Sequence, residues 1–323
     1  MVSRDISKAV KILMQEDLVA IPTETVYGLA GNIYSEKAIK AIFEMKQRPF
    51  FNPLIVHIKS IEQLDTIAKD IPEKAKLLAD KFWPGSLTLV LKKQKSVPDL
   101  VTAGKDTVAV RVPNHALTLE LLQALDFPLA APSANPFGAI SPTNALHVAE
   151  YFTEKLQMIL DGGDCLNGIE STIIGFENEE PVLYRLGSIS IEDIEAIIGK
   201  IKIKNKKENA PEAPGMLSRH YAPATATFLE TNVAQFIKGF PYKKIGLLLF
   251  KKRIENGGVM HQEILSEKGD LKEATSNLYA AMHRLDKMDL DMIVAEQFPD
   301  VELGKSINDR LKRATKKIKK NKK

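Results

Sequence analysis

The sequence predicts an α/β protein with two domains, the larger of which contains a sheet of mixed strand direction. Its 323 residues favour two domains of ordinary size. Segments with helical spacing of apolar residues alternate with short apolar runs that are typical of buried strands. Several expected strands follow one another closely, which does not match a simple repeated strand–helix–strand unit. At Lys202 the composition becomes charged, proline-containing and poor in apolar residues, which marks a domain boundary.

The first domain is expected to span residues 1–201. The spacing of apolar residues predicts helices over residues 6–15, 36–45, 73–81, 117–125, 143–151 and 191–198. Short apolar or β-rich runs predict strands over residues 18–21, 54–58, 87–91, 108–112, 129–132, 159–161, 171–175 and 182–185. Thr143 is the expected N-cap of its helix, and residues 22–25 are expected to form a loop.

A linker is expected over residues 202–223, and a smaller α/β domain over residues 224–315. In this second domain the pattern predicts strands over residues 226–230, 244–250 and 292–296, and helices over residues 272–286 and 306–318. The remaining residues, 316–323, are expected to form a basic tail.

The positive charge of the chain is concentrated at its end. The net charge is +4, but the last twelve residues contain eight Lys or Arg and no acid, so residues 1–311 carry a net charge of −4. Such a tail can contact nucleic acid through phosphate groups, or it can be an ordinary solvated terminus. The charge distribution alone leaves both interpretations of the tail open.

Composition also points to a folded protein of a reducing compartment. Hydrophobic residues make up 44% and charged residues 27% of the chain, which fits a globular protein. The single cysteine, Cys165, excludes a disulfide scaffold within the chain and is interpreted as a packed thiol. The N-terminus lacks a signal-peptide pattern, and the longest apolar runs are too short to cross a bilayer. We expect a cytoplasmic protein without a membrane segment.

Two cations, Lys46 and Arg48, are separated by one residue in a loop stiffened by Pro49 and Pro53. From extended backbone they would project in a similar direction. A fixed guanidinium and ammonium suit the phosphates of a nucleotide, although most such triplets are surface charges.

Three other loops are rich in small polar residues. Residues 22–29 place hydroxyls directly after an expected strand, where ligands often bind in open α/β sheets. Ser133 and Asn135 supply neutral donors and acceptors, but their setting also fits a simple turn. Residues 161–172 contain glycines that allow close approach of a ligand.

Common nucleotide and metal motifs are missing from the sequence. It has neither a Walker A pattern nor a GxGxxG pattern. Its histidines, none of which has a paired metal-ligand spacing, are His57, His115, His147, His220, His261 and His283. A Cys/His protease arrangement has little support, because only Cys165 is available.

Taken together, the motifs resemble the YrdC-type fold of threonylcarbamoyl-AMP synthases. The matching stretches cover residues 17 to 187 in the order of the family, namely IPTETVYGLA, KQRPFFNPLIVH, FWPGSLTLVL, VAVRVP, PLAAPSANPFGAISPT, LDGG, IESTII and LYRLG. The Lys-x-Arg and Ser-x-Asn tetrad that marks the family is intact. The stretches APGMLSRHYAP and INDRLKRA resemble the longer, two-domain branch, which implies a mixed twisted sheet with an open cavity and a Rossmann-like C-terminal domain.

The resemblance implies a nucleotidyltransferase that joins L-threonine, bicarbonate and ATP into threonylcarbamoyl-AMP and releases pyrophosphate. This is the first step of threonylcarbamoyl modification of adenosine 37 in tRNA, and a separate transferase complex performs the next step. Mg²⁺ would be carried by ATP, without a metal site of the protein. No side chain is an obvious covalent nucleophile, so positioning and electrostatics should dominate catalysis.

By the same resemblance, residues are assigned to two substrates. The residues implied in ATP binding are Arg48, Asn52, Thr107, Ser133, Ser141, Arg185 and Tyr221. The residues implied in threonine binding are Thr25, His57, Arg111, Ala131 through its backbone, and Ser171. Lys46, Arg48, Ser133 and Asn135 form the implied catalytic tetrad. Tyr221, with Arg219 and His220, belongs to a linker expected to close over the nucleotide.

Two alternatives remain open at this stage. One is another carbamoyl-transfer enzyme of the kind used in hydrogenase maturation, although neither the acylphosphatase-like nor the zinc-binding modules of those proteins are visible. The other is a double-stranded-RNA-binding module, which the net charge of −4 on residues 1–311 disfavours.

Overall fold

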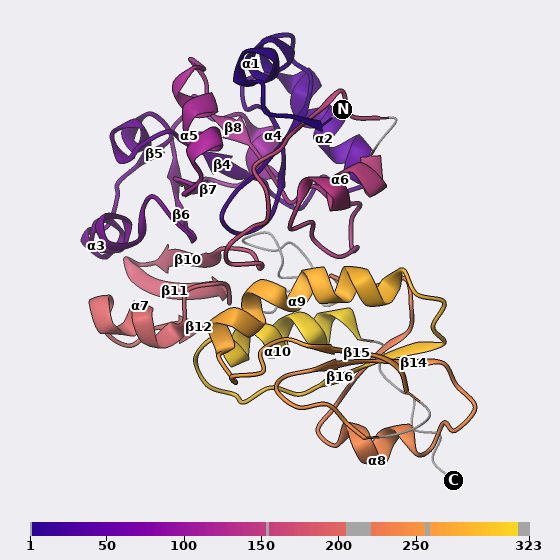
Figure 1. Ribbon diagram of the computed structural model, residues 1–323. Coiled ribbons are helices and arrows are strands. Elements are labelled where there is room, and N and C mark those ends of the chain that lie inside the picture. The colour runs from indigo at the N-terminus through magenta and orange to yellow at the C-terminus, as the bar shows by residue number, and fades with distance from the viewer. Residues whose placement is uncertain (1, 153–154, 205–220, 256–258, 316–323) are drawn as a thin grey trace. The chain divides into compact units, whose positions relative to one another are not determined.

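The computed structural model describes residues 2–152, 155–204, 221–255 and 259–315 (Figure 1). The chain divides into two compact units. The first consists of Met1–Phe137 and Ser141–Ser218, and the second of Gly138–Ile140 and Arg219–Lys323. Residues 138–140 therefore group with the C-terminal unit, which the sequence did not predict. No helix among the described residues is long and apolar enough to cross a membrane.

The first unit is built on a twelve-stranded sheet with the order β1-β9-β2-β3-β8-β4-β7-β6-β10-β11-β12, and β5 pairs with β6 beside it. The strands are β1 (Val2–Ser3), β2 (Val19–Ile21), β3 (Gly28–Asn32), β4 (Ile55–His57), β5 (Ala68–Lys69), β6 (Leu87–Lys93), β7 (Thr107–Arg111), β8 (Leu129–Ala130), β9 (Met158–Leu160), β10 (Thr172–Glu177), β11 (Glu180–Arg185) and β12 (Lys202–Ile203).

The sheet is mixed in direction, as predicted. β4 pairs with β7 in parallel, and so does β6 with β10, whereas β6 and β7 are antiparallel. β8 joins the two halves through antiparallel pairs with β3 and β4. Because strands far apart in sequence become neighbours, the loops after β2, β4, β7 and β8 come from distant parts of the chain.

Helices surround this sheet, and several begin at capping residues. The helices of the first unit are α1 (Ile6–Met14), α2 (Glu36–Lys46), the 3₁₀ helix η1 (Ile61–Thr66), α3 (Glu73–Phe82), α4 (Asp99–Thr102), α5 (Ala116–Gln123), α6 (Ala145–Phe152) and α7 (Ile191–Ile198). The side chains of Asp5, Ser35 and Ser190 each accept a backbone N–H in the first turn of a helix. These caps satisfy donors that a helix leaves free at its start.

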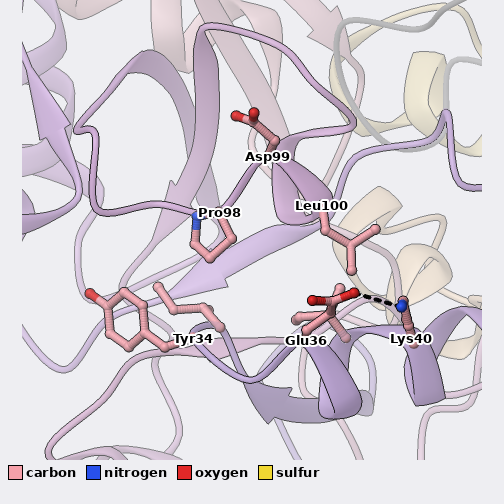
Figure 2. A pocket seen from close by; sticks show the side chains of 8 residues that line it. Tyr34, Glu36, Lys40, Pro98, Asp99 and Leu100 are labelled. Atoms are coloured by element: carbon pink, nitrogen blue, oxygen red, sulfur yellow. Dashed lines mark ion pairs between the residues drawn. The ribbon is translucent and has the colours of Figure 1, made fainter.

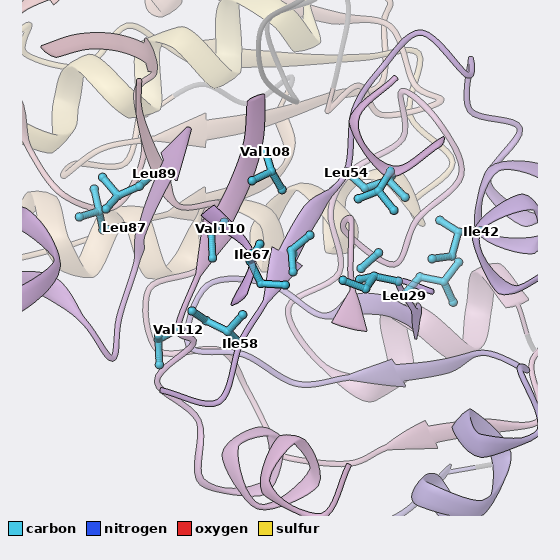
Figure 3. Packing of buried hydrophobic residues seen from close by; sticks show 14 of the residues in the cluster. Leu29, Ile42, Leu54, Ile58, Ile67, Leu87, Leu89, Val108, Val110 and Val112 are labelled. Atoms are coloured by element: carbon cyan, nitrogen blue, oxygen red, sulfur yellow. The ribbon is translucent and has the colours of Figure 1, made fainter. Parts of the chain in front are cut away.

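The core of the first unit lies between its helices and its sheet. Figure 3 shows Leu29 of β3 beside Ile42 of α2, and Val108 and Val110 of β7 within the same cluster. Burial of such aliphatic side chains removes apolar surface from water and is the main favourable term in folding. The rigid core fixes the strand ends from which the polar loops start.

The second unit is a four-stranded parallel sheet with the order β13-β16-β14-β15. Its elements are β13 (Thr227–Glu230), α8 (Val233–Ile237), β14 (Ile245–Leu249), β15 (Val259–Ile264), α9 (Leu271–Asp286), β16 (Met292–Glu296) and α10 (Glu302–Ala314). Helices α9 and α10 lie side by side on one face of the sheet, and α8 lies on the other (Figure 1). This confirms the predicted smaller α/β domain.

Some local predictions were wrong. β3 and β15 were missed, because Gly28–Asn32 is rich in glycine and residues 259–264 contain several polar residues. Helix α6 begins at Ala145, because the side chain of Asn144, and not that of Thr143, accepts the N–H of His147 at 3.0 Å.

Two predicted segments have different ends in the structure. Lys202–Ile203, expected to begin the linker, form β12 and pair in parallel with β11. Helix α10 spans Glu302–Ala314, so the prediction of residues 306–318 began too late. Residues 205–220 of the expected linker and the basic tail lie outside the described residues.

Candidate functional site

The loop of residues 22–27 after β2 is joined to two other polar loops by backbone hydrogen bonds. Ala134 N donates to Tyr27 O at 2.7 Å, and Asn167 N donates to Glu24 O at 2.7 Å. The sequence singled out these loops separately. The structure brings them together because one loop follows β8, which pairs with β3, and the other follows β9, which pairs with β2.

Lys46 lies at the last position of α2 and is 1% exposed. Its Nζ donates to Ser133 O at 2.5 Å and also to Asn135 O. Burial lowers the pKa of Lys46 well below its usual range, and the positive charge of Arg48 lowers it further. The structure thus joins the Lys-x-Arg and Ser-x-Asn motifs, with Lys46 contacting the backbone of the second motif.

Arg48 and Asn52 share the turn that follows α2. Gln47 ends the helix in the left-handed region, and Arg48 then donates from Nε to Asn52 O at 3.2 Å and from Nη2 to Pro53 O at 2.8 Å. Asn52 is fully buried, yet neither its Oδ1 nor its Nδ2 has a hydrogen-bond partner among the described residues. Such a buried amide costs about 1–3 kcal/mol, which is expected where a ligand supplies the missing partners.

Arg111, at the end of β7, is held by two segments of the chain, the loop of Glu24 and Thr25 and the segment of Gly85. Its Nη1 donates to Thr25 Oγ1 at 3.0 Å, and its Nε donates to Gly85 O at 3.0 Å. Its Nη2 forms an ion pair with Glu24 Oε1 at 2.6 Å, and both side chains are less than a tenth exposed. The orientation of the guanidinium is therefore fixed before any ligand binds.

His57 lies opposite Arg111 in the register of β4 and β7. Burial, and secondly the positive charge of Arg111, lower the pKa of His57 to about 3. Its Nδ1 lies 3.3 Å from Ile55 O. The imidazole is therefore neutral at pH 7 and offers one donor and one acceptor.

Ser171, which is assigned to threonine, contacts Arg185, which is assigned to ATP. Its Oγ lies 2.7 Å from Thr88 Oγ1 and accepts from Arg185 Nη2 at 2.9 Å. Arg185 Nε also donates to Ser171 O at 3.0 Å. Ser171 and Arg185 are thus in direct contact.

The other predicted residues of the first unit lie around these clusters. Ser141 donates from Oγ to Glu170 Oε1 at 2.6 Å, and the backbone N–H of Ala131 donates to Ile55 O at 3.0 Å. Thr107 begins β7, four residues before Arg111, which corresponds to about 13 Å along a strand. The structure does not bring Thr107 beside the Arg111 cluster.

Tyr221 belongs to the second unit and is buried there. Its ring centre lies 5.8 Å from that of Tyr279 in α9, and the guanidinium of Arg310 in α10 lies 5.1 Å from its ring centre. Arg219 and His220, the other residues of the expected lid, lie outside the described residues.

A cavity of about 430 Å³ lies away from these residues, between the start of α2 and α4. Figure 2 shows Glu36 and Lys40, which form a 2.6 Å ion pair, opposite Pro98, Asp99 and Leu100. None of the predicted site residues lines it. The described residues also contain no group of three or more His, Cys, Asp or Glu that could hold a metal ion.

Sequence reasoning missed Glu24, Thr88 and Glu170 as members of the site. Each is buried and makes a side-chain contact to a residue that was predicted. The available indication for Glu24 was an acidic residue between two threonines, directly after a buried strand. Its partner Arg111 is far away in sequence, so the pairing itself could not be predicted.

Comparison with known proteins gives a family match for each of the two units. A family model described as telomere recombination, named for the Sua5, YciO and YrdC proteins, matches residues 11–187. A second model, described as the C-terminal domain of threonylcarbamoyl-AMP synthase, matches residues 189–315. The fold and the polar loops therefore define a YrdC-type protein that carries this additional domain.

Full-length relatives make the assignment specific. The threonylcarbamoyl-AMP synthase of Pyrococcus abyssi is 42% identical over 321 residues, which cover 95% of this chain and 93% of the relative. That of Bacillus subtilis is 39% identical over 319 residues, covering 96% and 92%. A crystal structure of P. abyssi Sua5 with L-threonine superposes with a TM-score of 0.89 at 41% identity, covering 98% of this chain and 96% of that one. The chain belongs to the two-domain threonylcarbamoyl-AMP synthase family.

Proposed function

We propose that the chain joins L-threonine, bicarbonate and ATP into threonylcarbamoyl-AMP, with release of pyrophosphate. This makes it a nucleotidyltransferase that performs the first step of threonylcarbamoyl modification of tRNA. The observation that carries the proposal is the full-length match to threonylcarbamoyl-AMP synthases, combined with an intact Lys-x-Arg and Ser-x-Asn tetrad in which Lys46 contacts the backbone of Ser133 and Asn135.

The reaction needs two bond-forming steps. The neutral amine of threonine attacks the carbon of bicarbonate, and loss of water leaves a carbamate. A carbamate oxygen then attacks the α-phosphorus of ATP, and pyrophosphate leaves. The protein contributes by holding the reactants in line and by stabilising negative charge on the phosphates.

The threonine end of the site is assigned to the Arg111 cluster. The guanidinium of Arg111 pairs with the substrate carboxylate, and Thr25, His57, Ser171 and the backbone of Ala131 contact its other polar groups. The neutral state of His57 supports this assignment, because a neutral imidazole can accept from one polar group and donate to another. Binding of L-threonine by this chain is supported by the crystal structure of P. abyssi Sua5 complexed with L-threonine.

The ATP end of the site is assigned to the residues around Lys46. Arg48 and Asn52 face the phosphates, together with Ser133, Asn135, Ser141, Thr107 and Arg185, and the family resemblance adds Tyr221. Lys46 orders the Ser-x-Asn segment through its two carbonyl contacts. The fully buried, unpartnered amide of Asn52 supports a ligand at this place.

Mg²⁺ enters this scheme as part of the substrate MgATP. A hard cation of this type keeps several waters and is commonly held through phosphates. The guanidinium of Arg48 and the unpartnered amide of Asn52 are donors suited to phosphate oxygens, so the phosphates and water would hold the cation. When bound, the cation neutralises phosphate charge.

The remaining assignments concern the domains, the product and contact with tRNA. We place the catalytic domain at residues 1–203, so that it includes β12, the C-terminal domain at residues 224–315 and a basic tail at residues 316–323, with the expected lid in the sequence between the two domains. The product is a labile mixed anhydride, so it passes to a downstream tRNA threonylcarbamoyltransferase in the cytoplasm. Contact of this chain with tRNA is weak or indirect.

Pyrophosphate release by the purified protein tests the proposal. Release should require both L-threonine and bicarbonate, and omission of either should reduce it to background. Arg48→Ala should lower kcat/KM for ATP by about 100-fold or more, because it removes a forked donor from the phosphates. Arg284→Ala, which removes a guanidinium from the second unit, is the matched control. Threonine-independent release at the full rate would refute the proposed function.

A further inference from the structure

Glu24 is a buried carboxylate to which sequence and family resemblance assign no role. It lies in the loop after β2, beside Thr25, and its side chain is 6% exposed. Besides the ion pair with Arg111, its Oε1 accepts from Ser86 Oγ at 3.2 Å, and its Oε2 accepts from Asn114 N at 3.0 Å. Both carboxylate oxygens are therefore occupied by partners from the ends of β6 and β7.

The backbone of Glu24 joins a fourth segment to this cluster. Asn167 N donates to Glu24 O at 2.7 Å, and Asn167 Nδ2 donates to Ser86 Oγ at 2.5 Å. The loop of Thr25, the end of β7 with Arg111 and the loop that leads to Ser171 thus share one central residue. Displacement of Glu24 would change the relative positions of all three.

The contacts of Glu24 also determine how Arg111 can meet a ligand. Nε is occupied by Gly85 O, and one edge of the guanidinium faces Thr25 and Glu24. A planar guanidinium with fixed contacts on these sides can rotate little, so its remaining N–H bonds have a defined direction. Such preorganisation lowers the entropy that a carboxylate ligand loses on binding.

We propose that Glu24 is a positioning residue for the amino-acid substrate, which it serves by fixing the guanidinium of Arg111 and the adjoining Thr25 loop. The inference rests on the proposed function, because it assigns the Arg111 cluster to threonine. Glu24 also balances the charge of Arg111, so the pocket favours a zwitterionic amino acid over a ligand that carries only a carboxylate.

Glu24→Gln tests this role with little change of shape. The amide keeps one oxygen for Arg111 but places an NH₂ group opposite Asn114 N–H, so two donors face each other. Calorimetric binding of L-threonine should weaken about 10-fold or more, and KM for threonine should rise, whereas KM for ATP should change less than about twofold. Glu24→Asp keeps the charge and should recover part of the affinity.

Glu263→Gln is the matched control. Glu263 forms a two-point ion pair with Arg284 in the second unit, with distances of 3.0 and 2.7 Å. Its loss removes a comparable Glu–Arg pair that has no assigned role in binding, so threonine affinity should stay unchanged. Thermal unfolding of every variant measures the folded fraction, and Glu24→Asp takes over the test if Glu24→Gln does not fold.

A double-mutant cycle with Arg111→Lys separates positioning from general stability. If Glu24 acts through Arg111, Glu24→Gln should weaken threonine binding much less in the Arg111→Lys protein than in the wild type. Equal effects in both backgrounds, or equal changes in KM for both substrates, would overturn the inference. If the wild-type protein itself binds no L-threonine, the proposed function fails first, and the inference falls with it.

Discussion

Arg111 and Arg310 are both buried, but one is held by loops and the other by helices. Arg111 contacts a carboxylate, a hydroxyl and a carbonyl from two separate segments of the first unit. Arg310 lies in α10 of the second unit, over the ring of Tyr221 and 3.2 Å from Asp309. Asp309 is also bound by Arg313 one turn further along the helix.

The difference shows how a buried cation can serve two purposes. Around Arg111 the partners come from loops at strand ends, which is where ligands bind in open α/β sheets. Around Arg310 the charged partner among the described residues is Asp309, its neighbour on the same helix, and an aromatic ring covers the guanidinium. We therefore interpret Arg111 as a preorganised binding group and Arg310 as a structural contact that holds Tyr221 against α9 and α10.

The largest effect is expected for Arg111→Ala. Removal of the guanidinium leaves Glu24 buried without its ion-pair partner, which costs about 3–5 kcal/mol in free energy of unfolding. Arg310→Ala should cost about 2 kcal/mol, because Asp309 keeps its contacts with Arg313. Urea unfolding measures both values.

Activity separates the same two variants more clearly. Arg111→Ala should lower the threonine-dependent rate of pyrophosphate release by about 100-fold or more at subsaturating threonine, since it removes the carboxylate's partner. Arg310→Ala should leave KM for threonine unchanged. An equal rise in KM for threonine in both variants would contradict the division between binding and structural arginines.

A pH-dependent effect of intermediate size is expected at His57, next to Arg111. Its pKa is about 3 in the folded protein and about 6.5 when unfolded, so between these values only the unfolded chain takes up the proton. Stability contributed by the neutral ring is therefore present above pH 6.5 and is lost as the pH falls. Between pH 6.5 and 5, the wild type should lose about 1.5 kcal/mol more than His57→Asn. Parallel pH profiles of unfolding would exclude this role.

The elements that could be predicted are those whose residues carry a strong local pattern. Strands β6 and β7 consist of apolar, β-branched runs, and α9 has a clear amphipathic spacing. β3 was not predictable in this way, because Gly28 and Gly31 weaken any strand pattern. Gly31 is required by packing, since a Cβ there would lie 2.9 Å from a methyl group of Leu18.

Residues of the candidate site could be predicted where they lie in a distinctive stretch of sequence. Lys46 and Arg48 were recognised with Ser133 and Asn135, but the contact of Lys46 with backbone carbonyls depends on the path of α2 and could not be seen. Glu24 was missed for a related reason. Its importance depends on the ion pair with Arg111, which only the tertiary fold brings close to it.

The smallest effect concerns Tyr221 and tests the structural half of the comparison. Tyr221→Phe keeps the ring, and with it the contact to Arg310, so it should change the free energy of unfolding by at most about 1 kcal/mol. Tyr221→Leu removes the ring and should cost about 1 kcal/mol more through loss of the cation–π contact.

A double-mutant cycle of Tyr221→Leu and Arg310→Met identifies that contact directly. If the ring and the guanidinium stabilise each other, the two losses should be less than additive by about 1 kcal/mol. Strict additivity would mean that Arg310 does not hold Tyr221 through its ring. Arg310 would then be held by its charged neighbour Asp309, and the aromatic contact would no longer distinguish Arg310 from Arg111.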